Sequence, residues 1–291
     1  MIGVDSDELR PASVSRLLRQ SDIRPRKGLG QNFLVSERLL ERIIDAADLD
    51  EQDVVLEVGA GLGTLTGRLA RQAARVIALE VDARLIPLLE RALDPFGNVH
   101  IIRGDVLAIK PGDLVSPPYK VVANLPYYIT SAVLRHFLEA DAKPSLMVVT
   151  VQREVAERIV AGPGQMSLLA VSVQFYGQPR IVAKAPPGAF YPSPDVHSAV
   201  VRIDVRPSPR RHVDDVERFF QIVRAGFAQR RKQLRNSLSQ GLNLPVEQVV
   251  GALRRSGLRE TQRPQELSIE HWALLSQELV TMNAGQATEE P

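Results

Sequence analysis

The chain has 291 residues, of which 44% are hydrophobic and 24% charged, and its formal net charge is only +2. This composition is typical of a globular protein with one large domain and room for a smaller one. No apolar run approaches the length of a membrane span, so we expect no membrane association. The absence of cysteine excludes disulfide bonds, thiolate metal sites and methylation through a cysteine adduct, and five histidines without close pairing predict no metal site.

The N-terminal segment suggests a cytoplasmic protein and carries a first basic cluster. Residues 1–9 are acidic and lack the charged-then-apolar layout of a secretory signal. The basic cluster that follows is opposed only by Asp22 and consists of Arg16, Arg19, Arg24, Arg26 and Lys27. Clustered cations neutralise RNA phosphates, but a charge run is more often a solvated helix face. Both interpretations of this cluster stay open.

The next element is a strand that runs into a glycine-rich turn. Residues 53–58 read as a buried strand, the turn is Gly59-Ala60-Gly61-Leu62-Gly63-Thr64, and a helical pattern follows. Such a turn forms a nucleotide-binding crevice, because backbone without side chains can approach a ligand. The dinucleotide fingerprint would require Gly or Ala in place of Thr64. The chain has instead acid-x-G-x-G-x-G from Glu57, which is typical of S-adenosylmethionine-dependent methyltransferases.

Three further predicted strands each end on a polar side chain. Glu80 follows the predicted strand at residues 76–79, Asp105 comes after the one at 99–102, and Asn124 follows the one at 121–123. Open α/β sheets bind ligands at the carboxyl edge of their strands. There Glu80 would meet ribose hydroxyls and Asp105 an adenine amino group. Each acid alone is better explained as a helix cap or a solvated residue, but four strand ends in register favour a methyl-donor site.

The tetrapeptide Asn124-Leu125-Pro126-Tyr127 points to the atom that is methylated. An exocyclic amine such as adenine N6 is a poor nucleophile, because its lone pair is delocalised into the ring. A site that methylates it needs acceptors for the amine hydrogens, which the Asn124 side chain and the Leu125 carbonyl can supply. Pro126 stiffens the loop, and Tyr127 offers an aromatic face to an unstacked base. A plain strand-end turn with a core tyrosine is the alternative.

The pattern of elements predicts an α/β fold with a parallel sheet up to about Val205. Residues 196–205, with 181–183 before them, suggest antiparallel strands added to that sheet. The segment 206–209 (RPSP) reads as a linker, and helices are expected at about 213–228, 231–240, 246–256 and 269–282. We therefore expect a Rossmann-like catalytic domain over residues 1–205 and a small all-helical domain over 206–291.

A second basic cluster lies in the predicted helical domain. It contains no acid and consists of Arg224, Arg230, Arg231, Lys232 and Arg235. We interpret Arg230, Arg231, Lys232 and Arg235 as RNA-binding residues, because phosphate neutralisation is the main sequence-independent term in RNA affinity. A solvated helix face is the alternative.

The chain resembles the rRNA adenine N6-dimethyltransferase family, and within it the small-subunit (16S) branch, from about Arg24 to about Trp272. The matching motifs occur in the family's order, at residues 25–34 (PRKGLGQNFL), 57–66, 124–130, 152–158 (QREVAER), 190–202 (FYPSPDVHSAVVR) and 227–236 (FAQRRKQLRN). Departures are small: His197 stands where the family often has Asp, and Gln233 where it often has Thr. His197 lies outside the donor and amine positions, so we expect no catalytic role for it.

The resemblance implies a class I methyltransferase sheet and S-adenosyl-L-methionine as the cofactor. Carried over residue by residue, it puts Gln31, Asn32 and Leu34 beside the methionine end of the donor. It puts Gly59 and Gly61 under the donor, with Glu80 at the ribose, Asp105 at the adenine, and Asn124 between donor and acceptor. Phe190 is a candidate second stacking face for the target base beside Tyr127, although a core phenylalanine is at least as good an interpretation.

The function that the resemblance implies is dimethylation of adjacent adenosines in the 3′-terminal hairpin loop of small-subunit rRNA, with a role in subunit biogenesis. The expected partner is the small ribosomal subunit, and a monomer is expected. One alternative is the sister activity on large-subunit rRNA that confers macrolide resistance. The other is a non-catalytic RNA-binding assembly factor, against which the intact glycines, acids and Asn124 argue.

Overall fold

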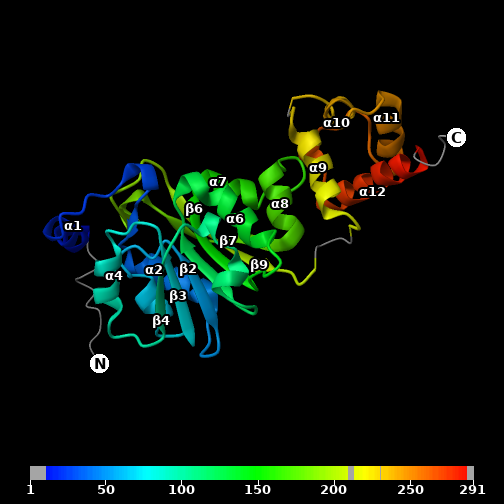
Figure 1. Cartoon of the computed structure of the whole chain (residues 1–291). Coiled ribbons are helices and arrows are strands. Elements are labelled where there is room, and N and C mark those ends of the chain that lie inside the picture. Colours follow the sequence, from blue (N-terminus) through cyan, green and yellow to red (C-terminus); the bar gives the residue numbers. More distant parts are fainter. Residues whose placement is uncertain (1–10, 209–212, 230, 287–291) are drawn as a thin grey trace. The chain divides into compact units, whose positions relative to one another are not determined.

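The computed structural model describes residues 11–208, 213–229 and 231–286, and it divides the chain into two compact units (Figure 1). The first unit contains Met1–Glu157 and Gln178–Val205, and the second contains Arg158–Gly177 and Arg206–Pro291. Val205 is also where the sequence places the expected domain division. Residues 158–177, expected in the first domain, group with the C-terminal helices.

The first unit is built on a seven-stranded mixed sheet in the order β4-β3-β2-β5-β6-β9-β7. Its strands are β2 (Val54–Val58), β3 (Arg75–Glu80), β4 (Val99–Arg103), β5 (Lys120–Asn124), β6 (Leu146–Gln152), β7 (Gly177–Ala185) and β9 (Ser198–Val205). Strands β2 to β6 pair in parallel, and β9 pairs antiparallel with β6. The predicted parallel sheet with antiparallel additions is confirmed.

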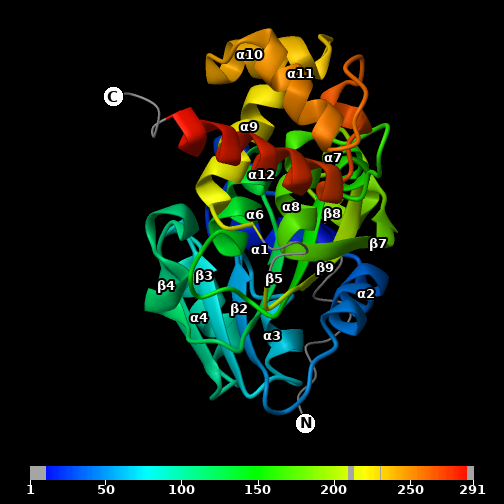
Figure 2. The ribbon, with the colours of Figure 1, turned by 90° about the vertical axis from the view of Figure 1, so that its right-hand side faces the viewer.

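Helices flank this sheet on both sides, with α2 and α4 on one side and α6 on the other (Figures 1 and 2). The helices of the first unit are α1 (Pro11–Gln20), α2 (Glu37–Ala47), α3 (Thr66–Leu69), α4 (Ile86–Leu93), α5 (Pro111–Leu114), α6 (Thr130–Leu138) and the start of α7 (Arg153–Ile159). Ser36 caps helix α2, because its hydroxyl accepts from the Leu39 N–H, and the helix buries Leu40 and Ile43 in the core. With both faces covered, the parallel strands are apolar runs.

The strand order reverses between β2 and β5, which makes their carboxyl ends the switch point where such sheets bind ligands. A short antiparallel pair joins this edge to the N-terminal segment. Strand β1 (Phe33–Leu34) pairs with β8 (Phe190–Tyr191), with Leu34 opposite Phe190. The pairing fixes the segment before β1 close to the switch point.

The second unit is helical and gains its extra segment through aromatic packing. Its helices are α8 (Leu168–Tyr176), α9 (Val216–Phe227), α10 (Leu234–Leu242), α11 (Val246–Arg255) and α12 (Ile269–Gln286) (Figure 2). Phe175 of α8 stacks on Phe219 of α9 at 4.7 Å and meets Phe220 edge-on at 5.3 Å. These ring contacts are the physical reason why α8 belongs with the C-terminal helices. No described helix is both long enough and apolar enough to span a bilayer.

Candidate active site

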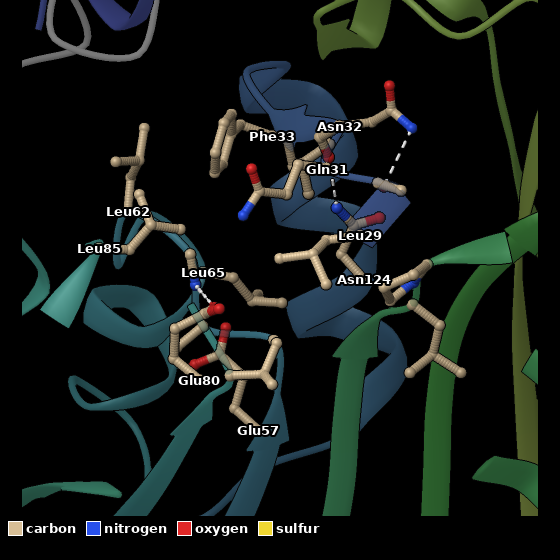
Figure 3. Close-up of a pocket in the computed structure, with 18 of the residues that line it drawn as sticks. Leu29, Gln31, Asn32, Phe33, Glu57, Leu62, Leu65, Glu80, Leu85 and Asn124 are labelled. Atoms are coloured by element: carbon tan, nitrogen blue, oxygen red, sulfur yellow. Dashed lines mark hydrogen bonds between the residues drawn. The ribbon is translucent and has the colours of Figure 1, made fainter. Parts of the chain in front are cut away.

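A cavity opens at the carboxyl ends of β2, β3 and β5 in the first unit (Figure 3). The space between its walls, with the open mouth included, is about 760 Å³. The lining residues come from three short segments and several strand ends: Leu29, Gly30, Gln31, Asn32, Phe33, Leu34, Glu57, Gly59, Ala60, Gly61, Leu62, Thr64, Leu65, Glu80, Val81, Leu85, Asn124, Leu125, Pro126 and Tyr127. Most of the predicted site residues therefore lie together.

The floor of the cavity is the glycine-rich turn after β2. Gly59 and Gly61 have φ angles of 77° and 60°, in the left-handed region that side chains disfavour. The Gly59 N–H donates to the Leu79 carbonyl at 2.8 Å, which ties the turn to β3. The turn can take this path only because both positions are glycine, and it leaves backbone exposed to a ligand.

Glu80 ends β3 with both carboxylate oxygens anchored. One oxygen accepts from the Gly61 N–H and the other from the Asp82 N–H, each at 2.8 Å. Burial raises the pKa of the Glu80 carboxyl, while these two backbone donors favour its charged form. The carboxylate is thereby fixed in orientation, with its remaining lone pairs available to hydroxyl groups of a ligand.

Glu57 is a second acid in the cavity and is 1% exposed. Burial raises the pKa of its carboxyl to about 8, and the nearby Glu80 carboxylate adds to the rise. Its Oε2 atom has no hydrogen-bond partner within the described part of the chain. An orphaned acid at this depth is costly unless a ligand group completes its bonding.

Asn124 is held by the segment opposite. Its Nδ2 donates to the Asn32 carbonyl at 2.8 Å (Figure 3). A carbonyl can only accept, so the amide nitrogen must face Asn32 and the side-chain oxygen is left as an acceptor at the cavity. This is the orientation that an amine substrate requires.

The loop after Asn124 brings Leu125, Pro126 and Tyr127 to the cavity, as expected. The Tyr127 hydroxyl lies 2.5 Å from the Ser198 hydroxyl at the start of β9, and burial raises the pKa of Tyr127. The hydrogen bond fixes the position of the hydroxyl end of the ring beside the cavity. Ser198 was missed by the sequence reasoning, since a serine that begins a strand carries no local signal.

The N-terminal segment covers the cavity with the three residues expected at the donor's methionine end. Gln31, Asn32 and Leu34 all line it. The Gln31 Nε2 donates to Asp82 Oδ2 at 2.9 Å, and Asp82 is only 2% exposed. Arg84 holds the pKa of the Asp82 carboxyl far below its usual range. Sequence reasoning missed Asp82, because a carboxylate two residues after Glu80 looks like an ordinary turn residue.

Two expected site residues do not line the cavity. Asp105 is exposed and caps the short helix Val106–Ala108, where its side chain accepts from the Leu107 N–H at 2.9 Å. It follows Gly104, whose N–H donates to the Glu80 carbonyl, so it lies beside the end of β3. Phe190 is 3% exposed and packs in the core with Leu34. The hydrophobic effect places this ring inside, and it offers no free stacking face.

The predicted RNA-binding residues are only partly available. Arg230 lies outside the described residues, while Arg231 and Lys232 are exposed. The sequence predicts that Arg231 and Lys232 begin a helix, but they lie in a turn between α9 and α10. Helix α10 begins only after Gln233, whose backbone is extended. Arg235 is paired with Glu260 at 3.5 Å, which competes with phosphate. The N-terminal cluster is exposed at Arg16, Arg19, Arg24, Arg26 and Lys27.

The charge of the lining fits a cationic ligand. Glu57 and Glu80 are the acidic residues among the described residues of the cavity wall, which contains no Lys, Arg or His. S-adenosylmethionine has two positive groups, a sulfonium and an ammonium, and one negative carboxylate, so its net charge is positive. A dinucleotide has an anionic pyrophosphate, which buried acids disfavour. The orphaned Glu57 oxygen and the glycine turn agree with the first ligand.

Comparison with known proteins gives consistent matches over most of the chain. The family description "Ribosomal RNA adenine dimethylase" matches residues 23–281. A Dehalococcoides mccartyi protein named Ribosomal RNA small subunit methyltransferase A is 47% identical over 266 residues, covering 91% of each chain. A Bacillus cereus protein of that name is 41% identical, covering 88% of this chain and 91% of its own.

Solved structures share the fold. The 23S rRNA methyltransferase ErmE superposes with a TM-score of 0.70 at 29% identity, covering 86% of this chain and 100% of its own. A dimethyladenosine transferase from Plasmodium falciparum gives 0.74 at 23% identity, with 87% and 98% covered. The expected class I methyltransferase fold and S-adenosylmethionine cofactor are confirmed. The chain therefore belongs to the ribosomal RNA adenine dimethylase family.

Proposed function

We propose that this enzyme dimethylates N6 of adjacent adenosines in the 3′-terminal hairpin loop of small-subunit rRNA, with S-adenosylmethionine as the donor, during subunit biogenesis. The observation that carries the proposal is the cavity itself. The cavity has two buried acids and no cation among its described lining residues, and its floor of glycines lies at the same sheet edge as an oriented amide acceptor. The relatives named small subunit methyltransferase A support the choice of subunit.

In the proposed donor site, Glu80 accepts from the ribose hydroxyls and Gln31, Asn32 and Leu34 surround the methionine end. Gly59 and Gly61 lie under the ligand, and the unpartnered Oε2 atom of Glu57 is available to a group of the ligand. Asp105 would reach the adenine only from beside β3, since it is exposed. Bound S-adenosylmethionine supplies an electrophilic methyl group.

In the proposed acceptor site, the flipped adenine stacks on Tyr127, whose hydroxyl is hydrogen-bonded to Ser198. The Asn124 side-chain oxygen and the Leu125 carbonyl accept the two N6 hydrogens and turn the lone pair toward the methyl group. Pro126 holds this loop rigid. No strong base is needed, because the N6 proton is acidic once the nitrogen has gained a methyl group, and catalysis comes from positioning.

The rest of the proposal concerns the partner. Residues 206–291, with the α8 excursion, dock on rRNA through Arg231, Lys232 and the neighbouring Arg230, while the first unit performs the chemistry. We further propose that the enzyme acts as a monomer. We place the enzyme in the cytoplasm, where ribosomal subunits are its substrate.

The test is methyl transfer from labelled donor to undermodified small and large subunits, with mapping of the labelled bases. We expect label on adjacent adenosines near the small-subunit 3′ end. The likeness to ErmE makes large-subunit methylation the second candidate, and label confined to the large subunit would select it. Absence of transfer to either subunit, with intact donor binding, would leave the assembly-factor alternative.

A further inference from the structure

The segment that covers the cavity, residues 24–34, is here named the strap. Six consecutive strap residues, 29–34, line the cavity, and β1 anchors the far end of the strap by pairing with β8. Its near end has no strand pairing among the described residues. Side-chain contacts therefore decide how firmly this end is held.

Those contacts converge on the buried carboxylate of Asp82. Gln31 donates to Asp82 Oδ2 at 2.9 Å, and its own Oε1 accepts from the Arg26 N–H at 2.7 Å. Arg84 donates to both Asp82 oxygens, at 2.9 and 2.5 Å, and reaches the Arg24 carbonyl at 3.4 Å. Asp82 thus ties three positions of the strap to the end of β3, with Arg84 compensating its charge.

The same residue also touches the donor side. The Asp82 N–H fixes one oxygen of Glu80 at 2.8 Å. Beyond Gln31, the next strap residue presents its carbonyl to the Asn124 amide at 2.8 Å. An unbroken path therefore runs from Glu80 through Asp82 and the strap to Asn124.

We infer that Asp82 is a positioning residue that couples the two ends of the site: it holds the strap, and the strap holds Asn124 in its acceptor orientation. Asp82 itself does not line the cavity, so it acts through Gln31 and Asn32. The kinetic consequence rests on the proposed function, whereas the hold on the strap does not. The competing explanation is that Asp82 only caps its own turn, where it accepts from the Arg84 N–H at 3.1 Å.

The test is Asp82→Asn, which keeps the shape but turns one acceptor oxygen into a donor that faces Gln31 or Arg84. Hydrogen exchange should speed up at the strap amides, such as Leu29 and Gly30, which are hydrogen-bonded within the strap. Single-turnover methyl transfer at saturating donor should fall on the order of 10- to 100-fold, since Asn124 loses its fixed orientation.

The matched control is Asp53→Asn. Asp53 directly precedes β2, at the end of that strand away from the cavity. Asp53 is likewise an ion-paired aspartate, 2.7 Å from Lys120. It should lose stability with no change in strap exchange or in turnover of the folded protein. If Asp82→Asn does not fold, Arg84→Leu carries the same test, because it removes the donors that fix the Asp82 carboxylate.

Unchanged strap exchange in a folded Asp82 variant overturns the inference and leaves the turn cap as the role of this residue. Faster strap exchange with turnover within twofold of wild type overturns the coupling to Asn124. If the wild-type enzyme methylates no rRNA, the proposed function is refuted. The hydrogen-exchange comparison needs no RNA, so it still shows whether Asp82 holds the strap.

Discussion

At the scale of single residues, Asn124 illustrates how a backbone carbonyl can set the chemistry of a side chain. The Asn32 carbonyl accepts from the amide nitrogen at 2.8 Å, and this leaves the side-chain oxygen as an acceptor at the cavity. The type of residue follows from the sequence motif. Its orientation depends on a strap residue more than ninety positions away, and no local pattern encodes it.

We predict that Asn124→Ala lowers the single-turnover rate by about 100- to 1000-fold, the usual cost of losing one group that acts mainly in the transition state. Donor affinity should change only a few-fold. The matched control is Asn98→Ala, since Asn98 also bonds backbone carbonyls, at 2.8 and 2.9 Å, but away from the cavity. A variant that retains nearly the wild-type rate contradicts the role of Asn124.

For the donor, Glu80→Ala should weaken binding by about 1.5–3 kcal/mol, roughly 10- to 150-fold, because the ligand hydroxyls lose a charged acceptor. Calorimetric titration measures this directly. Asp105→Ala should have a smaller effect, since Asp105 is exposed and its side chain already caps residues 106–108. Equal losses at both positions would show that Asp105 reaches the ligand as firmly as Glu80 does.

Glu57 makes stability depend on pH. Its carboxyl has a pKa of about 8 in the folded chain against an ordinary value of 4.5, so the folded state holds a proton that the unfolded state releases between these values. The contribution is therefore fully present below pH 4.5 and is lost as the pH rises to about 8. The free energy of unfolding should fall, relative to Glu57→Gln, by about 1.4 kcal/mol per pH unit in this window.

Denaturant titrations of wild type and Glu57→Gln at several pH values measure this difference. A constant difference between the two proteins from pH 5 to 8 would mean that Glu57 is ionised throughout. Saturating S-adenosylmethionine should reduce the slope, because a cationic ligand favours the carboxylate.

At the scale of elements, strand positions could be read from apolar runs and their polar ends. β2, β3, β4 and β5 each lie where the sequence predicts a strand, and the glycine or polar residues at the carboxyl ends of β2, β3 and β5 line the cavity. The β1–β8 pair joins residues 33–34 to 190–191 and could not be predicted, because two-residue strands carry no periodicity. The core position of Phe190 follows from that pairing.

Helix α8 is the element whose assignment depends most on long-range packing. Phe175→Ala should destabilise the second unit by about 3–5 kcal/mol, since it empties the space between α8 and α9. Hydrogen exchange should then report loss of protection in α9 before the sheet. The matched control, Phe137→Ala in α6, removes an equally buried ring from the first unit and should loosen the sheet side instead. The reverse order would contradict the assignment of α8.

At the scale of the whole molecule, a net charge of +2 conceals an uneven distribution. Two buried acids lie in the cavity wall, while exposed cations gather in the N-terminal cluster and in the turn at Arg231 and Lys232. The sequence predicted both clusters but not which cations are already paired. Arg235 is engaged by Glu260, a residue 25 positions later in the chain.

Reversing Arg231 and Lys232 to Glu should weaken binding to the small subunit and lower the salt slope by roughly 0.7–0.9 for each phosphate that is no longer neutralised. Filter binding at several salt concentrations measures both, and donor affinity should be unchanged. The matched control is Arg259→Glu, an exposed arginine of the same unit that is 3.8 Å from Glu266. Equal effects of both variants would mean that overall charge matters more than this turn. Unchanged RNA affinity would indicate that the RNA docks instead on the Arg16–Lys27 cluster.

The excursion of residues 158–177 has a consequence for how the polypeptide can be made and cut. During synthesis, α8 emerges before its partner α9, so the nascent chain carries Phe175 without Phe219 until the C-terminal helices follow. A fragment that stops at Val205 would keep Phe175 without its partner ring, so we expect it to self-associate more readily than the full chain. Grafting the C-terminal unit onto another methyltransferase therefore requires transplanting two segments together.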